Sequence, residues 1–238
     1  MKVAVCVSGV ARGEVDANIA LMKKHFPFDF FYATWNNQSS NLENCYHYSE
    51  PSMFYHPIRD IVDTPAPKLA IQKHQLVTGQ YDINFYQRTL NHTKQILIHD
   101  MLLKDIPQEY NMIIRARFDT RLSTKVDFTK YLEMSYNDNL AVGFGTRTSR
   151  HSNYNVMREI PKIYPNGNDD VSQDWGWYLM DPLIFHPRKL WNHDLVTTLH
   201  NNKQLKAAEW GWYQILSEPY KDNHMCVYGG AQIEKYLK

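Results

Sequence analysis

The sequence predicts a single α/β domain in which a mostly parallel, Rossmann-like sheet is flanked by helices. The chain opens with a β-branched apolar segment, a loop with two glycines, a helix-like segment and a second apolar segment, which is the pattern of a βαβ unit. Further along, a long helix-like segment leads directly into another short apolar run. Because βαβ crossovers are right-handed and join parallel strands, both observations favour a parallel sheet.

The N-terminal third supplies the βαβ unit. KVAVCVS reads as a strand, and the helix after the loop places Ala17 and Leu21 on its apolar face. FDFFYATW reads as the second strand and is followed by a polar loop. The two strands are expected at 2–8 and 28–35, the helix at 14–26 and the loop at 36–44.

The middle of the chain contains an irregular part and a regular part. Four prolines between residues 45 and 82 predict irregular structure with short pieces. From residue 84 to 104 there is no proline, and Leu90, Leu97 and Met101 form the apolar stripe of a long helix. Strands are expected next at 111–117 and 139–144.

The C-terminal third is less regular. The polar segment 145–172 lacks a clean period and is a candidate lid over a site. Strand pieces are expected around an Asp181-Pro182 turn, and MCVY, at 225–228, is expected to form the last strand. Helices are expected at 187–200 and 207–218.

Composition narrows the class of protein. The 238 residues are 43% hydrophobic and 21% charged, which is ordinary for a globular domain. A net charge of +1 gives no electrostatic footprint for nucleic acid or an anionic membrane. The three cysteines lack the spacing of a zinc site or a disulfide framework, and no signal peptide or membrane-length apolar segment is present. We therefore expect a cytoplasmic protein.

The segment NMIIRARFDTRL, residues 111–122, sets one carboxylate among three arginines. If the strand continued to residue 121, side chains would alternate between the faces of the sheet. Ligands of open α/β sheets bind beyond the carboxyl ends of strands, where this carboxylate would lie. The alternative is a structural Arg–Asp pair that holds a loop. The residues that would share one face are Arg115, Arg117, Asp119 and Arg121.

The loop SGVARG follows the first strand. It lacks the spacing of a dinucleotide fingerprint and of a phosphate loop. It could still bring backbone N–H groups and Arg12 close to a phosphate. The alternative is a tight turn with a solvated arginine. No histidine pair suits a metal and no serine lies in a GxSxG elbow, so zinc-enzyme and hydrolase functions are disfavoured.

Two aromatic motifs, DWGWY and EWGWY, begin at Asp174 and Glu209. Aromatic rings beside carboxylates suit sugar binding, because ring faces pack on C–H groups while carboxylates accept hydroxyl protons. Trp175 and Trp177 are the candidate acceptor-binding residues, and Asp174 followed by Glu209 are the candidate catalytic bases. The alternative is that both motifs are buried aromatic anchors.

Taken together, VCVSGVARG, DFFYATW, YNMIIRARFDTRL, DWGWYLMDPLIF and AEWGWYQIL resemble, in this order, small GT-A-type glycosyltransferase-like proteins of viral and bacterial surface-polysaccharide clusters. The resemblance implies a GT-A-like domain that transfers a sugar from a nucleotide-sugar donor to a saccharide or other hydroxyl acceptor. It implies a nucleotide-binding half, 1–120, and an acceptor-binding half, 121–238. It places Ser8, Gly9 and Arg12 at the nucleotide and Asp119 on a divalent metal.

This sequence departs from the family pattern at Arg121, where a second metal-binding carboxylate would stand. Mn²⁺ or Mg²⁺ held by Asp119, or guanidinium groups, would stabilise the charge that develops on a leaving diphosphate. Arg115, Arg117 or Arg121 would keep Asp119 ionised and face the diphosphate. Two other functions are a glycan-binding or scaffold protein without turnover, and a sulfo- or phosphotransferase, which the missing phosphate loop disfavours.

Overall fold

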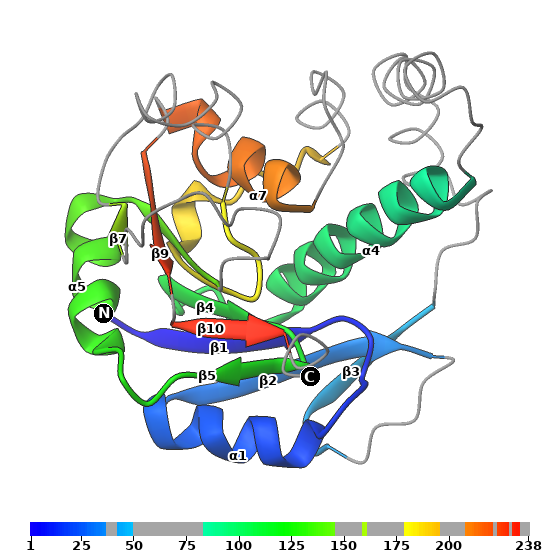
Figure 1. The fold of residues 1–238 in the computed structure, drawn as a ribbon, viewed down its shortest axis with the longest axis horizontal. Coiled ribbons are helices and arrows are strands. Elements are labelled where there is room, and N and C mark those ends of the chain that lie inside the picture. Colours follow the sequence, from blue (N-terminus) through cyan, green and yellow to red (C-terminus); the bar gives the residue numbers. More distant parts are fainter. Residues whose placement is uncertain are drawn as a thin grey trace.

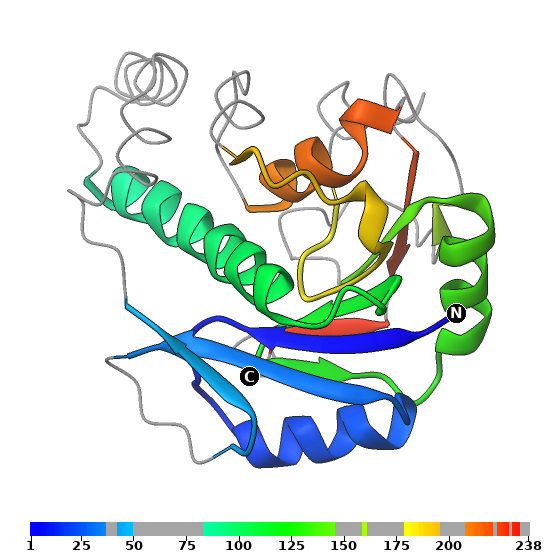
Figure 2. The ribbon, with the colours of Figure 1, turned by 180° about the vertical axis from the view of Figure 1, so that it is seen from behind.

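The computed structural model describes residues 1–36, 42–49, 83–145, 159–160, 179–195, 208–220, 223–228 and 230–233. It confirms the predicted fold class, a single α/β domain whose mostly parallel sheet is flanked by helices (Figures 1 and 2). The sheet has eight strands in the order β3-β2-β1-β4-β8-β6-β9-β7. Strands β8 and β7 run antiparallel to their neighbours, and the other described pairs of this sheet are parallel.

The βαβ unit lies where the sequence predicts it. It consists of β1 (Val3–Ser8), α1 (Val15–His25) and β2 (Asp29–Trp35), and β1 pairs with β2 in parallel. The helix face differs by one residue from the prediction, because Asn18, Ile19 and Met22 are buried while Ala17 is exposed. Asn18 points inward because its amide donates a hydrogen bond of 3.1 Å to the backbone carbonyl of Phe118.

The middle of the chain contains elements that were predicted and elements that were missed. Helix α4 (Ile83–Asp105) leads into β4 (Met112–Ala116), as predicted, and β6 (Ala141–Gly145) was also expected. Two missed elements are the edge strand β3 (Cys45–Tyr48) and helix α5 (Phe128–Asp138). The ends of α5 were readable from the sequence, because Asp127 accepts hydrogen bonds from the first turn and Asn139 adopts the left-handed conformation that ends a helix.

The C-terminal third contributes strands to both sheets. β8 (Leu183–Pro187) follows the Asp181-Pro182 turn. The helix expected at 187–200 begins as a 3-10 turn, η3 (Arg188–Leu190), and residues 191–194 are irregular. Leu195 is helical, and residues 196–200 lie outside the described residues. α7 (Ala208–Leu216) confirms the later helix and is followed by η4 (Glu218–Tyr220). β9 (His224–Tyr228) is not the last strand, since β10 (Ala231–Ile233) pairs with β5 (Thr120–Leu122) in a second sheet. The candidate lid contributes β7 (Glu159–Ile160), and the rest of residues 146–178 lies outside the described residues.

The helices cover both faces of the main sheet. Helices α4 and α7 pack on one face, and α1 and α5 cover the other (Figure 1). The alternation of β1 explains how one strand serves both layers, because Ala4 and Cys6 join the α4 side while Val3, Val5 and Val7 join the α1 side. No helix in the described part of the chain has the length and apolar composition needed to cross a membrane.

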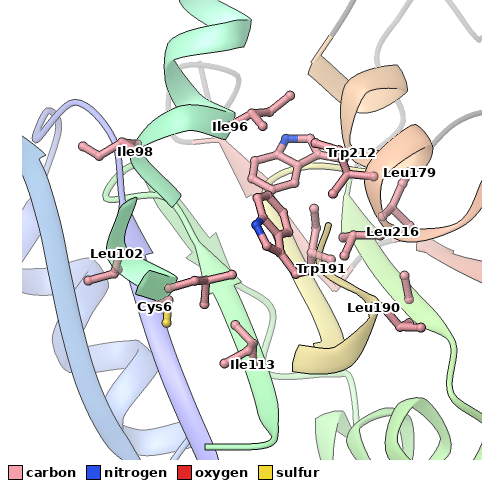
Figure 3. Packing of buried hydrophobic residues seen from close by; sticks show 14 of the residues in the cluster. Cys6, Ile96, Ile98, Leu102, Ile113, Leu179, Leu190, Trp191, Trp212 and Leu216 are labelled. Atoms are coloured by element: carbon pink, nitrogen blue, oxygen red, sulfur yellow. The ribbon is translucent and has the colours of Figure 1, made fainter. Parts of the chain in front are cut away.

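Figure 3 shows the core between α4, α7 and the sheet, where the rings of Trp191 and Trp212 lie side by side with centroids 5.7 Å apart. Trp212 has no exposed surface. Trp212 of the EWGWY motif is therefore a buried aromatic anchor. This agrees with the alternative to sugar binding that the sequence left open for this motif.

Candidate functional site

The candidate site lies at the carboxyl ends of β1 and β4. From β1 the chain continues to β2 and β3 on one side, and it returns through α4 to place β4 on the other side of β1. Such a reversal of strand order opens a crevice between the loops that leave the two strands, and ligands of α/β sheets bind there. The loop Gly9–Glu14 leaves β1, and the segment Arg117–Asp119 leaves β4.

The segment after β4 is a turn, so the strand does not continue to Arg121, which was the condition for the four charged residues to share one face. The backbone N–H of Thr120 donates to the carbonyl of Arg117 at 3.2 Å, and the N–H of Arg117 donates to Thr120 Oγ1 at 3.1 Å. Thr120 Oγ1 donates in turn to the carbonyl of Pro182 at 2.6 Å. With Asn18 bound to Phe118 on the other side, the turn is fixed by α1 and by the segment before β8.

Asp119 is the centre of an arginine cluster. Its Oδ1 accepts from Arg117 Nε at 2.8 Å, and its Oδ2 accepts from Arg117 Nη2 at 2.9 Å and from Arg12 Nε at 2.8 Å. Arg117 Nη1 lies 3.3 Å from Asp181 Oδ2. The side chains of Asp119, Arg117 and Asp181 are 6%, 12% and 5% exposed, whereas that of Arg12 is 50% exposed. The cluster is therefore buried on one side and open at Arg12.

The charges in the cluster stabilise one another. Burial alone would raise the pKa of the Asp119 carboxyl, but the charge and hydrogen bonds of Arg117, together with the hydrogen bond from Arg12, lower it below its ordinary value. Burial likewise disfavours the charged form of Arg117, but Asp181 and Asp119 outweigh this and raise its pKa. Of the three arginines expected to keep Asp119 ionised, Arg117 contacts it, and Arg12, which was expected at the nucleotide, contacts it as well.

The other two predicted arginines lie elsewhere. Arg115 is fully buried, donates from Nη1 to the backbone carbonyl of Asp181 and stacks over the Trp212 ring, with its guanidinium carbon 4.3 Å from the ring centroid. Arg121 is exposed in β5, opposite Gln232, and does not contact Asp119. The turn separates them, so the four predicted residues do not share one face.

Ser8 and Gly9 end β1 beside the Arg12 loop. The Ser8 hydroxyl is buried and has no hydrogen-bond partner among the described residues. Gly9 has φ of +126°, which favours glycine, and apart from Gly9 and its two chain neighbours no described residue has an atom within 4 Å of the position that a Cβ would occupy. The backbone at Gly9 is thus open to close approach by a ligand.

The arrangement does not fit a divalent metal at Asp119. Mn²⁺ and Mg²⁺ need several oxygen ligands, and a cation at this carboxylate would lie against two guanidinium groups. The described residues contain no group of three or more His, Cys, Asp or Glu side chains that could hold a metal. The second carboxylate of the cluster, that of Asp181, also contacts Arg117.

The predicted catalytic and acceptor-binding residues are not described with their side chains. Asp174, Trp175 and Trp177 lie outside the described residues, and Glu209 is placed in α7 by its backbone alone. Sequence reasoning missed Asp181 and Asn18 as partners of the cluster, and also Gln95, whose Oε1 lies 3.5 Å from Arg117 Nη1. The Asp-Pro turn was the signal available for Asp181, because it places a carboxylate at the start of a strand.

Behind the cluster, two buried histidines pack against the aromatic core. His99 and His186 have ring centroids 5.8 Å apart, and both ring nitrogens of His99 and Nε2 of His186 have no hydrogen-bond partner among the described residues. Burial lowers the pKa of His186 to about 4, and burial lowers that of His99 well below its ordinary value of 6.5. Both side chains are therefore neutral in the folded protein near pH 7.

We expect these histidines to make the fold acid-sensitive. They bind protons in the unfolded chain near pH 6.5 but not in the folded one, so stability is complete above pH 6.5 and is lost as the pH falls toward 4. The shift of His186 corresponds to about 3 kcal/mol. Urea unfolding at several pH values measures this loss. His186→Gln should flatten the dependence between pH 6.5 and 4, whereas the exposed His47→Gln should not; equal profiles would contradict the assignment.

Comparisons with known proteins give distant structural neighbours. A 4-diphosphocytidyl-2C-methyl-D-erythritol synthase from Anaerococcus prevotii has 8% identity and a TM-score of 0.47, with 96% of this chain and 87% of that chain covered. A glycosyltransferase involved in glycosylation of the major capsid of PBCV-1 has 8% identity and a TM-score of 0.39 over 96% and 83% of the two chains. Core-mannan synthase A from Aspergillus fumigatus, in a Mn/GDP form, has 11% identity and a TM-score of 0.46 over 90% and 66%.

Glycosyltransferases are thus among the structural neighbours, and at these identities the likeness concerns the fold alone. No family model matches the chain, and no curated protein matches it in sequence.

Proposed function

We propose that this protein is a glycosyltransferase of the GT-A type that moves a sugar from a nucleotide-sugar donor to a saccharide or other hydroxyl acceptor. The observation that supports it most is the meeting of Arg12 and Arg117 on Asp119 at the reversal of strand order between β1 and β4. Two guanidinium groups, of Arg12 and Arg117, and two carboxylates, of Asp119 and Asp181, meet there. The half-exposed guanidinium of Arg12 at this strand end favours an anionic ligand such as a diphosphate.

The proposed chemistry needs stabilisation of a leaving group. When the sugar–phosphate bond breaks, negative charge develops on the diphosphate, and guanidinium N–H groups aimed at that position lower the barrier. Arg12 would meet the diphosphate directly because it is half exposed, while buried Arg117 holds Asp119 and Asp181 in place. Residues 1–120 would thus bind the nucleotide, and residues 121–238 would bind the acceptor.

The acceptor side is proposed from the sequence motif. Trp175 and Trp177 would form the platform for a sugar, and Asp174 would accept the proton of the attacking hydroxyl, with Glu209 as the second candidate. The resemblance to proteins of surface-polysaccharide clusters supports a saccharide as the acceptor.

A panel of nucleotide sugars, screened by thermal shift and then by donor turnover, tests the proposed function. We expect one donor class to raise the melting temperature and to be consumed when a saccharide acceptor is present. Failure of every nucleotide and nucleotide sugar to bind would contradict the proposal. Binding of glycans without donor turnover would favour the scaffold function instead.

We expect Asp174→Asn to lower turnover by about 10²-fold or more, with a smaller effect on donor affinity, because a general base acts on the acceptor rather than on the donor. Steady-state kinetics with separate donor titrations measure both quantities. Near-normal turnover in this variant together with an inactive Glu209→Gln would reverse the assignment, and two active variants would remove both carboxylates from catalysis.

A further inference from the structure

The first feature that bears on anion binding is the Asp119 carboxylate, which has little capacity left for another ligand. Both of its oxygens accept charge-assisted hydrogen bonds, and the three N–H groups lie 2.8, 2.9 and 2.8 Å away. The carboxylate is also 6% exposed. A metal could reach it only by displacing a guanidinium and leaving Arg117, which is 12% exposed, without part of its counter-charge.

The second feature is the way in which Arg12 is held. Its Nε donates to Asp119, and among the described residues its two terminal nitrogens have no partner, while half of the side chain is exposed. Anchoring through Nε fixes the plane of the guanidinium and leaves its outer N–H groups available. A guanidinium fixed in this way loses little conformational freedom when it binds an anion.

The third feature is the surroundings of Arg12. The loop that carries it connects β1 to the first turn of α1, whose N-cap residue, Glu14, makes no side-chain capping hydrogen bond. The buried Ser8 hydroxyl, which lacks a partner among the described residues, and the open backbone of Gly9 lie at the same strand end. N–H groups at a helix N-terminus and a fixed guanidinium are both donors that suit phosphate oxygens.

We propose that this site binds the diphosphate of a nucleotide through Arg12 without a divalent metal, and that Asp119 is the internal counter-ion that orients Arg12 and Arg117. The identity of the ligand as a nucleotide diphosphate rests on the proposed function. Asp119 is accordingly a positioning residue, and Arg12 is the residue that contacts the anion. The guanidinium groups supply the positive charge that a divalent metal would supply in a metal-dependent glycosyltransferase.

Titration calorimetry with inorganic pyrophosphate, in EDTA and then in Mn²⁺ or Mg²⁺ without EDTA, tests the proposal. Part of the pyrophosphate forms a complex with the metal in solution, so the Kd measured with Mn²⁺ or Mg²⁺ must be corrected for that fraction. We expect the Kd in EDTA to agree with the corrected value within about twofold. Binding that is absent in EDTA and restored by either metal would overturn the proposal, as would no binding of pyrophosphate under any of these conditions.

The variant Arg12→Gln should weaken pyrophosphate binding by about 10-fold or more, because a charge-assisted contact is lost. Arg12→Lys should recover little of this, since lysine cannot anchor on Asp119 while presenting a second donor pair. The matched control is Lys24→Gln, an exposed cation at the far end of α1, which should bind as the unsubstituted protein does. Equal affinities for Arg12→Gln and the control would refute the assignment.

The pyrophosphate titration also separates this inference from the proposed function. A protein that binds pyrophosphate through Arg12 in EDTA but accepts no nucleotide sugar would retain the anion site and refute the glycosyltransferase proposal. A protein that transfers sugar only with Mn²⁺ and binds pyrophosphate only with Mn²⁺ would support the glycosyltransferase proposal and refute the metal-independent anion site.

Discussion

Replacing Trp212 by alanine is expected to lower the free energy of unfolding by about 4 kcal/mol, since truncation of a buried aromatic side chain costs about 3–5 kcal/mol. Trp212 is among the largest side chains with no exposed surface, and it packs against Trp191 and His99. Its ring also covers the guanidinium of Arg115. Alanine would therefore leave both a cavity and a buried cation without its aromatic partner.

Chemical denaturation of Trp212→Ala measures this loss, and Trp212→Phe is the control. Phenylalanine keeps an aromatic face over Arg115, and the Trp212 indole N–H has no hydrogen-bond partner among the described residues, so its removal breaks no described bond. We expect the phenylalanine variant to lose less than half as much stability as the alanine variant. A loss below about 1 kcal/mol in Trp212→Ala would show that α7 does not depend on this anchor.

Replacing Asp119 by asparagine is expected to cost about 3 kcal/mol of folding free energy at pH 7, because removing one member of a buried ion pair leaves an uncompensated charge. Arg117 would keep only Asp181 as a carboxylate partner, at 3.3 Å. The amide nitrogen of asparagine would also face N–H groups of Arg117 or Arg12 where an oxygen now accepts.

The matched control is Asp127→Asn, at the N-cap of α5, where asparagine caps a helix about as well as aspartate. Denaturation at pH 7 should show the large loss for Asp119→Asn alone. The pKa of Asp119 is lowered in the folded state, so its contribution to the free energy of unfolding is present above pH 3.8 and is lost as the pH falls below that value. The difference in stability between the variant and the unsubstituted protein should therefore shrink in acid. Equal losses in the two variants would contradict a buried ion pair at Asp119.

The parts of the fold that were predictable are those encoded by local periodicity. The β1–α1–β2 unit, α4 and β4 follow from apolar spacing within one element. The alternation of Arg115, Arg117 and Asp119 is compatible with a longer strand, but β4 ends at Ala116. The turn that interrupts them is fixed by Asn18 and Pro182, and neither partner is visible to a local pattern.

The candidate site was predictable residue by residue but not as a geometry. Arg12 and Asp119 were each selected from the ends of strands, yet their hydrogen bond joins residues 107 positions apart. Asp181 was seen as a turn residue, and its place beside Arg117 depends on the antiparallel insertion of β8 next to β4. The role of Arg115 could not be read either, because its burial depends on Trp212 of α7.

The insertion of β8 between β4 and β6 also has a consequence for biosynthesis. Strands β1 to β4 are complete once residue 116 has left the ribosome, but the free edge of β4 is covered only when Leu183–Pro187 emerges. At about 5–20 residues per second, translation of the intervening stretch of roughly 70 residues leaves that edge unpaired for roughly 4–14 s. An unpaired strand edge is a template for pairing with other chains. The nascent protein thus passes through an interval in which chaperone protection of β4 matters most.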